Sequence, residues 1–134
     1  MVGQPRGATR GLIAIDTSAL RRFLSGESGR DVDLVRTAVA EGRGVLPPVV
    51  LCEALSDPNL PAGLAEDLSA LPILDIEQGF WFRAGMLRSR LIKAGYKAKL
   101  ADVLIAQTCI DHGVALISND RDFRHFTRHG LKLV

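Results

Sequence analysis

The chain alternates short apolar runs with segments that have the spacing of amphipathic helices. Apolar and branched residues dominate positions 11–15, 44–46, 72–76 and 114–118, and a last short run occupies 131–134. Runs of this length, bounded by glycine, proline or polar residues, predict buried strands. Strands that alternate with helices pair in parallel and carry helices on both faces of the sheet. We therefore predict an α/β fold, a three-layer α/β/α sandwich around a central, mostly parallel sheet.

The segments between these runs predict helices at 19–24, 31–41, 48–56, 62–70, 78–94 and 100–112. Thr17 or Ser18 is placed to cap the first of them. Pro47 and Pro48 suit the start of the third, because proline is tolerated in the first turn of a helix. The helix at 100–112 is apolar almost all round, so we expect it to be buried.

Four acidic residues stand at the edges of these apolar elements. Asp16 ends the first run and Asp120 follows the fourth, while Glu53 and Asp102 lie early in the helices at 48–56 and 100–112. Acidic side chains are rarely buried without a partner. In open parallel sheets, the ligand lies beyond the carboxyl ends of the strands. The predicted topology therefore lets these four acids converge at one edge of the sheet.

Converging carboxylates repel one another unless a cation neutralises them. Mg²⁺ and Mn²⁺ prefer oxygen ligands, and no Cys/His pair in the chain has the spacing of a zinc site. A bound cation can polarise a phosphate oxygen and promote ionisation of water. The leading hypothesis is a metal-dependent enzyme that acts on phosphodiesters, with one or two ions.

Each acid also has a simpler explanation. Asp16 and Asp102 could cap helices, where a negative charge also suits the helix dipole. Glu53 could pair with a buried arginine, and Asp120 or Asp122 could form a turn.

Basic residues flank the acids. No acid occurs between Gln78 and Ala101, a stretch rich in arginine and lysine, and a second basic group lies near the C-terminal end. Lysine and arginine side chains that contact the phosphate backbone supply much of a protein's affinity for nucleic acid. We expect the following side chains to contact a nucleic acid, although a solvated helix face would look the same: Arg88, Lys93, Lys97, Lys99 and Arg121. Tyr96 could stack on an unpaired base, whereas Phe80, Trp81 and Phe82 favour the core or a dimer interface.

Length and composition fit one soluble domain. The chain has 134 residues, of which 47% are hydrophobic and 24% charged, and its net charge is +2. We expect a flexible lead-in at 1–10 and a single domain at 11–134. No apolar run approaches the roughly 18 residues that a membrane span needs. Cys52 and Cys109 lie in apolar surroundings and are expected to be buried thiols, which favours the cytoplasm.

Four motifs in this order resemble the PIN-domain ribonucleases, and within them the VapC toxins of toxin–antitoxin modules. They are Asp16-Thr17-Ser18 after a strand, Glu53 in an apolar helix, Ala101-Asp102-Val103-Leu104-Ile105-Ala106, and Ile117-Ser118-Asn119-Asp120-Arg121-Asp122-Phe123. The resemblance covers positions 12 to 134.

The resemblance implies a Rossmann-like sandwich, Mg²⁺- or Mn²⁺-dependent endonucleolytic cleavage of RNA, a homodimer, and a cognate antitoxin. Asp16, Glu53, Asp102 and Asp120 match the acidic quartet of the family, as catalytic residues and metal ligands. Asp122 matches an acid beside the fourth position, so either or both can act. In supporting roles, Thr17 and Ser118 match polar positions of the family; many members have threonine at the second, which keeps the hydroxyl.

Two other functions remain open at this point. One is a PIN nuclease of RNA maturation or decay that has no antitoxin. The other is a Mg²⁺-binding, receiver-like signalling module, which would need a phospho-accepting Asp75 and a late lysine. No lysine lies between Lys99 and Lys132, which counts against the receiver.

Overall fold

The computed structural model describes residues 11–134 and contains one parallel sheet. Its strands are β1 (Ile13–Ile15), β2 (Gly44–Val45), β3 (Ala115–Ile117) and β4 (Lys132–Leu133), in the order β2-β1-β3-β4. Every pairing is parallel. The predicted α/β class and parallel sheet are therefore confirmed, with β1 and β3 in the centre.

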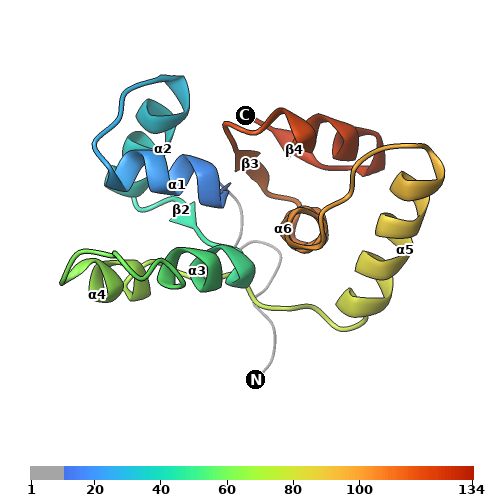
Figure 1. Cartoon of the computed structure of the whole chain (residues 1–134), viewed down its shortest axis with the longest axis horizontal. Helices are drawn as coiled ribbons and strands as arrows, with labels where there is room; N and C mark the ends of the chain where they lie inside the picture. Colours follow the sequence, from blue (N-terminus) through green and yellow to red (C-terminus); the bar gives the residue numbers. More distant parts are fainter. Residues whose placement is uncertain (1–10) are drawn as a thin grey trace.

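Helices flank this sheet (Figure 1), with α5 at one end of the molecule and α4 toward the other. Figure 1 shows α6 between α5 and the N-terminal helices, beside β3. The helices are α1 (Thr17–Leu24), α2 (Arg30–Ala40), α3 (Pro48–Leu55), α4 (Leu64–Ser69), α5 (Phe80–Lys93), α6 (Leu100–His112) and the 3₁₀ helix η2 (Arg121–His129). None of the helices within residues 11–134 is long and apolar enough to cross a membrane.

Helix α6 is buried as its sequence predicts. Val103, Ile105, Ala106 and Cys109 have at most 1% of their surface exposed. The polar Thr108 is also buried, and its hydroxyl donates to the Leu104 carbonyl at 2.7 Å. Because that hydroxyl is satisfied within the helix, burial leaves no unpaired polar group there.

The predicted strand at 72–76 is wrong in extent. Only Ile73 forms a bridge, in parallel with Leu46 beyond the end of β2. The Leu46 amide donates to the Pro72 carbonyl, and the Leu74 amide donates to the Leu46 carbonyl. Pro72 has no amide hydrogen to extend this ladder toward the chain's N-terminus, so the segment stays a short contact at the sheet edge.

The 3₁₀ helix η2 is not among the predicted elements. Its two buried aromatic residues, Phe123 and Phe126, are three positions apart, and a 3₁₀ helix brings residues at that spacing onto one row. This short helix covers the end of the core beside β4 and places its charged side chains outside.

Cys109 is buried as predicted, but Cys52 is exposed. Helix α3 buries Val50 and Ala54, four residues apart, and Cys52 lies on the opposite side of the helix between them. Burial of Cys109 raises the pKa of its thiol. The predicted lead-in at 1–10 lies outside the described residues.

Candidate active site

The first acid, Asp16, follows β1 and has 2% of its surface exposed. It is itself the N-cap of α1, because its Oδ1 accepts a hydrogen bond from the Ala19 amide at 2.8 Å. The prediction that Thr17 or Ser18 would cap this helix is therefore wrong. The Ser18 hydroxyl instead donates to the carboxylate of Asp16, at 3.0 Å from each oxygen.

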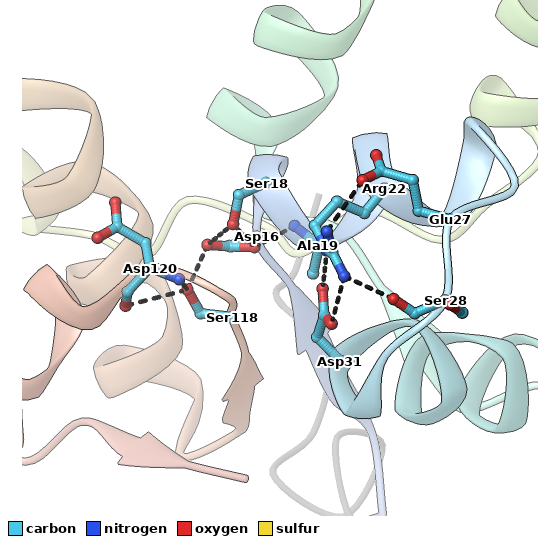
Figure 2. A network of polar contacts seen from close by, with 9 residues as sticks. All are labelled: Asp16, Ser18, Ala19, Arg22, Glu27, Ser28, Asp31, Ser118 and Asp120. Carbon is cyan, nitrogen blue, oxygen red and sulfur yellow. Dashed lines mark hydrogen bonds and ion pairs between the residues drawn. The ribbon is translucent and has the colours of Figure 1, made fainter.

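Ser118 connects Asp16 to the second acid, Asp120. The Ser118 hydroxyl donates to Oδ2 of Asp16 at 2.5 Å and accepts from the Asp120 amide at 2.9 Å. Figure 2 shows Ser118 between the two acids, at the end of β3. Ser118, expected in a supporting role, therefore hydrogen-bonds to both acids that follow the central strands.

Asp120 is the N-cap of η2, and its Oδ1 accepts from the Asp122 amide at 2.9 Å. This capping turn explains why Asp122 lies beside Asp120 instead of pointing to a separate surface. One oxygen of Asp120 is engaged by the turn, as the simpler explanation of this residue expects, and the carboxylate still reaches the other acids.

Three carboxylates come together at this edge of the sheet. Asp102, Asp120 and Asp122 each place an oxygen within 4.8 Å of the others, and all three are half-buried. Asp102 lies in the first turn of α6 and Asp122 in the first turn of η2, so the N-terminal ends of these two helices meet here. The structure thus groups Asp122 with two of the four acids that the sequence singled out.

Glu53 stands next to this trio. It lies on α3, and its Oε1 accepts a hydrogen bond from the Thr17 hydroxyl at 2.6 Å. Thr17, expected in a supporting role, therefore contacts one of the predicted acids. The charges of Asp120, Glu53 and Asp122 all act on Asp102, and Asp120 acts on Asp16, which places all five acids in one electrostatic unit.

Burial and mutual repulsion disfavour the ionised forms of these carboxylates. Desolvation, followed by the charge of Asp120, raises the pKa of Asp102 from its ordinary 3.8 to about 6, and Lys99 opposes this only in part. Desolvation also raises the pKa of Asp16, against the hydrogen bonds it accepts from Ser118, Ala19 and Ser18. A divalent cation among these oxygens would relieve both costs.

The donors present match a hard cation. They are carboxylate oxygens, which Mg²⁺ and Mn²⁺ prefer, and no cysteine or histidine belongs to the group that the described residues form. The residues therefore fit a divalent metal of this class.

The basic residues expected to contact RNA fall into two groups. Lys99 precedes α6, close enough to Asp102 for its charge to lower the pKa of that carboxyl, and Arg121 lines a hollow next to Ser118 and Asp120. Lys93 and Lys97 are exposed farther along the α5–α6 segment. The Arg88 guanidinium donates to the Ala98 carbonyl at 2.8 Å, so it holds the loop before α6.

Sequence reasoning missed two features of the site. Ser18 was expected to cap a helix, and its contact with both oxygens of Asp16 has no sequence signal beyond its position. Tyr96 was considered as a base-stacking residue; its ring stacks on His125 of η2, with centroids 4.2 Å apart. This contact joins the loop before α6 to η2, and Asp102 and Asp122 lie in the first turns of these two helices.

The order of these motifs and this arrangement of strands and acids match a known domain. A family model described as PIN domain matches residues 13–128. The chain belongs to the PIN domain family. PIN domains are nucleases, which supports a hydrolase of phosphodiester bonds, and membership leaves no basis for the receiver-like alternative. Asp75, which that alternative needs, follows a single bridge, not a strand.

Solved structures share this PIN fold over nearly the whole chain. A chain of VapBC2 from Rickettsia felis, bound to a DNA fragment from its promoter, is 21% identical, with a TM-score of 0.72 over 92% of this chain and 97% of that chain. A chain of FitAcB from Neisseria gonorrhoeae is 18% identical, with a TM-score of 0.69 over 91% and 96%. A chain of DNA-bound VapBC from Salmonella typhimurium is 17% identical, with a TM-score of 0.66 over 92% and 96%. No curated protein matches the chain.

Proposed function

We propose that the protein is a Mg²⁺- or Mn²⁺-dependent endoribonuclease and the toxin of a toxin–antitoxin pair. The observation that carries the proposal is the carboxylate trio of Asp102, Asp120 and Asp122 at the carboxyl edge of a PIN sheet. A trio this close, with one member whose pKa is raised to about 6, is built for a cation and is costly without one.

In this proposal Asp102, Asp120 and Asp122 hold the cation, and Asp16 and Glu53 complete the site directly or through water. When bound, the ion supplies positive charge that polarises the scissile phosphate and favours hydrolysis by water. Ser118 fixes the rotamer of Asp16, and Thr17 fixes that of Glu53. Preorganised carboxylates keep the site ready for the substrate without rearrangement during the reaction.

The RNA backbone approaches through the basic rim. The charge of Lys99 acts on Asp102, and Arg121 lines a hollow together with Asp120. Lys93 and Lys97 extend the first side with exposed ammonium groups, and Arg88 shapes the loop between them. These cations neutralise phosphates near the carboxylates, which themselves repel RNA.

Cleavage of a mixed RNA pool tests the nuclease directly. We expect cleavage with Mg²⁺ or Mn²⁺, none with EDTA, and none by Asp102→Asn under any condition. The exposed Asp33, which pairs with Arg36 on α2, supplies the matched control, because Asp33→Asn should cleave like the parent. Equal cleavage by the Asp102→Asn variant would remove the metal site from the mechanism.

The toxin role rests on the structural neighbours, which come from VapBC and FitAB complexes. It implies a cytoplasmic protein and an antitoxin that blocks the carboxylates. Expression should arrest growth, and co-expression of a small neighbouring gene product should restore it. Cleavage without growth arrest would favour a PIN nuclease of RNA maturation or decay instead.

We also propose a homodimer through α5. Phe80 is buried as predicted, whereas Trp81 and Phe82 are 67% and 75% exposed. Large apolar side chains with this exposure are typical of interfaces. Light scattering should give the mass of a dimer for the parent and that of a monomer for Phe82→Asp, and a monomeric parent would rule the dimer out.

A further inference from the structure

Next to the carboxylates lies a second, cationic feature that the proposed metal site does not use. A hollow of about 380 Å³ lies at the carboxyl ends of β3 and β4, and the residues that line it include Ser118, Asp120, Arg30, Arg121 and Arg124. A neighbouring hollow of about 320 Å³ shares Arg30, Ser118, Asn119 and Val134 with the first. The two hollows therefore adjoin, and Asp120 of the carboxylate trio lines the first.

The hollow is lined by more arginine side chains than acidic side chains. Those of Arg121 and Arg124 make no hydrogen bond or ion pair with another residue of the described range 11–134. Arg30 donates from Nη1 to the backbone oxygen of Val134 at 3.2 Å, and its other guanidinium N–H groups can still donate to a ligand. Asp120 is the acidic side chain among the residues that line the hollow.

The half-buried Arg22, on the same side of the molecule, is already neutralised. It pairs with Asp31 at 2.8 Å and with Glu27 at 3.0 Å, and it also donates to the Ser28 carbonyl (Figure 2). Asp31, which lines the neighbouring hollow, is itself paired with Arg22, and it does not line the first hollow. The excess positive charge therefore lies at the three arginines of the first hollow.

The geometry of η2 explains why two of these arginines act together. Residues three apart lie on one row of a 3₁₀ helix, so Arg121 and Arg124 share a row. Phe123 and Phe126 form a second row, which packs into the core. Arg128 belongs to a third row with Asp122, and it lines a different hollow between α5, α6 and η2.

We propose that Arg121 and Arg124, with Arg30, bind a phosphate of the RNA strand that flanks the scissile phosphate. This inference rests on the proposed function and adds to it a substrate subsite. A guanidinium presents several planar N–H donors that match phosphate oxygens, and it stays charged at any relevant pH. The carboxylates need a cation to accept a phosphate, whereas the hollow accepts one directly. Asp120 lines the hollow and also belongs to the trio, so one strand can reach both.

The test compares Arg121→Gln/Arg124→Gln with Arg128→Gln. Arg128 is an exposed arginine on the same helix, and the described residues offer its guanidinium no partner either. The probe is a fluorescein-labelled single-stranded RNA of mixed sequence. Its Kd is measured by anisotropy across a salt series, in EDTA, with each variant placed in the Asp102→Asn chain so that metal and cleavage play no part.

We expect the double variant to raise Kd roughly tenfold or more at low salt, since hydrogen bonds to charged groups are the stronger class. The salt slope should fall by about 0.7 for each RNA phosphate that the variant no longer neutralises. Arg128→Gln should change Kd less than about twofold and leave the slope in place. Equal loss of affinity in the double variant and in Arg128→Gln, or no loss in either, would overturn the subsite.

A cleavage assay on chains with Asp102 intact separates the two proposals. If the parent cleaves RNA and the double variant keeps the parent's KM, the nuclease stands and the subsite fails. If the parent does not cleave while the double variant alone loses RNA affinity, the hollow stands as a phosphate site and the nuclease fails.

Discussion

Replacing Asp102 with asparagine should stabilise the metal-free protein while it removes activity. Within residues 11–134 the Asp102 carboxylate accepts no hydrogen bond, so asparagine of the same shape breaks none. It does remove a charge that burial and the neighbouring Asp120, Glu53 and Asp122 disfavour. Ionised Asp102 therefore destabilises the folded protein relative to the unfolded chain, and the substitution relieves this.

The magnitude follows from the pKa. A carboxyl whose pKa is about 6 instead of 3.8 is disfavoured by roughly 3 kcal/mol when ionised, at about 1.4 kcal/mol per pH unit. Solvent screening of a half-exposed group reduces this to about 1.5 kcal/mol. An acid in the first turn of a helix also gains roughly 0.5 kcal/mol from the helix dipole, which asparagine loses. The net gain is about 1 kcal/mol, or roughly 3–5 °C in Tm for a domain of this size.

The sign of the pH dependence is fixed by the raised pKa. Stability associated with protonated Asp102 is present below pH 3.8 and is lost as the pH rises through about 6. Asparagine carries no such dependence. In EDTA, the difference in Tm between Asp102→Asn and the parent should therefore be small near pH 4.5 and full at pH 7.5, as measured by calorimetry.

Bound metal should make the parent more stable than Asp102→Asn. At a Mn²⁺ concentration about 100 times Kd, the parent gains about 2.7 kcal/mol, while the variant gains much less. Asp33→Asn, at an exposed site on α2, should change Tm little in either condition. A lower Tm for Asp102→Asn in EDTA at pH 7.5, or a difference from the parent that does not depend on pH, would refute this explanation.

Substitutions at three further residues test the surroundings of the carboxylates. Asp16→Asn should keep the α1 cap and the fold but abolish cleavage, whereas Asp16→Ala should in addition cost about 1 kcal/mol in chemical unfolding, because the cap is removed. Ser118→Ala should lower kcat and Ser118→Thr should restore it, since the hydroxyl orients Asp16; equal kcat in both would show that the hydroxyl has no such role. Tyr96→Ala should lose roughly 1 kcal/mol of stability with its stack on His125 and weaken Mn²⁺ uptake, and unchanged calorimetric titration would deny that the stack positions the acids.

The grouping of these acids was largely predictable, because they lie at the ends of strands and helices whose apolar patterns are clear. Asp16 and Asp120 follow buried strands whose branched residues predict the sheet, and parallel pairing brings their ends together. Asp102 opens an unusually apolar helix, which fixes both its burial and its place beside the core. Such acids are visible in sequence because their neighbours are so uniformly apolar.

The remaining features depend on interactions that no local pattern encodes. Whether Asp16, Thr17 or Ser18 caps α1 depends on side-chain rotamers, and all three residue types suit that position. The strand expected at 72–76 is reduced to the bridge between Ile73 and Leu46, since Pro72 has no amide hydrogen to extend the ladder. The row of Arg121 and Arg124 is visible only once η2 is known to be a 3₁₀ helix, because a three-residue period differs from both common periods.

The central claim is that these carboxylates form a divalent cation site. Anomalous diffraction from crystals soaked in Mn²⁺ tests it most directly, because it locates the ion without relying on activity. We predict a Mn²⁺ peak bounded by the carboxylates of Asp102, Asp120 and Asp122, and its disappearance in Asp102→Asn. Ordered carboxylates with no peak among them at saturating Mn²⁺ would contradict the claim.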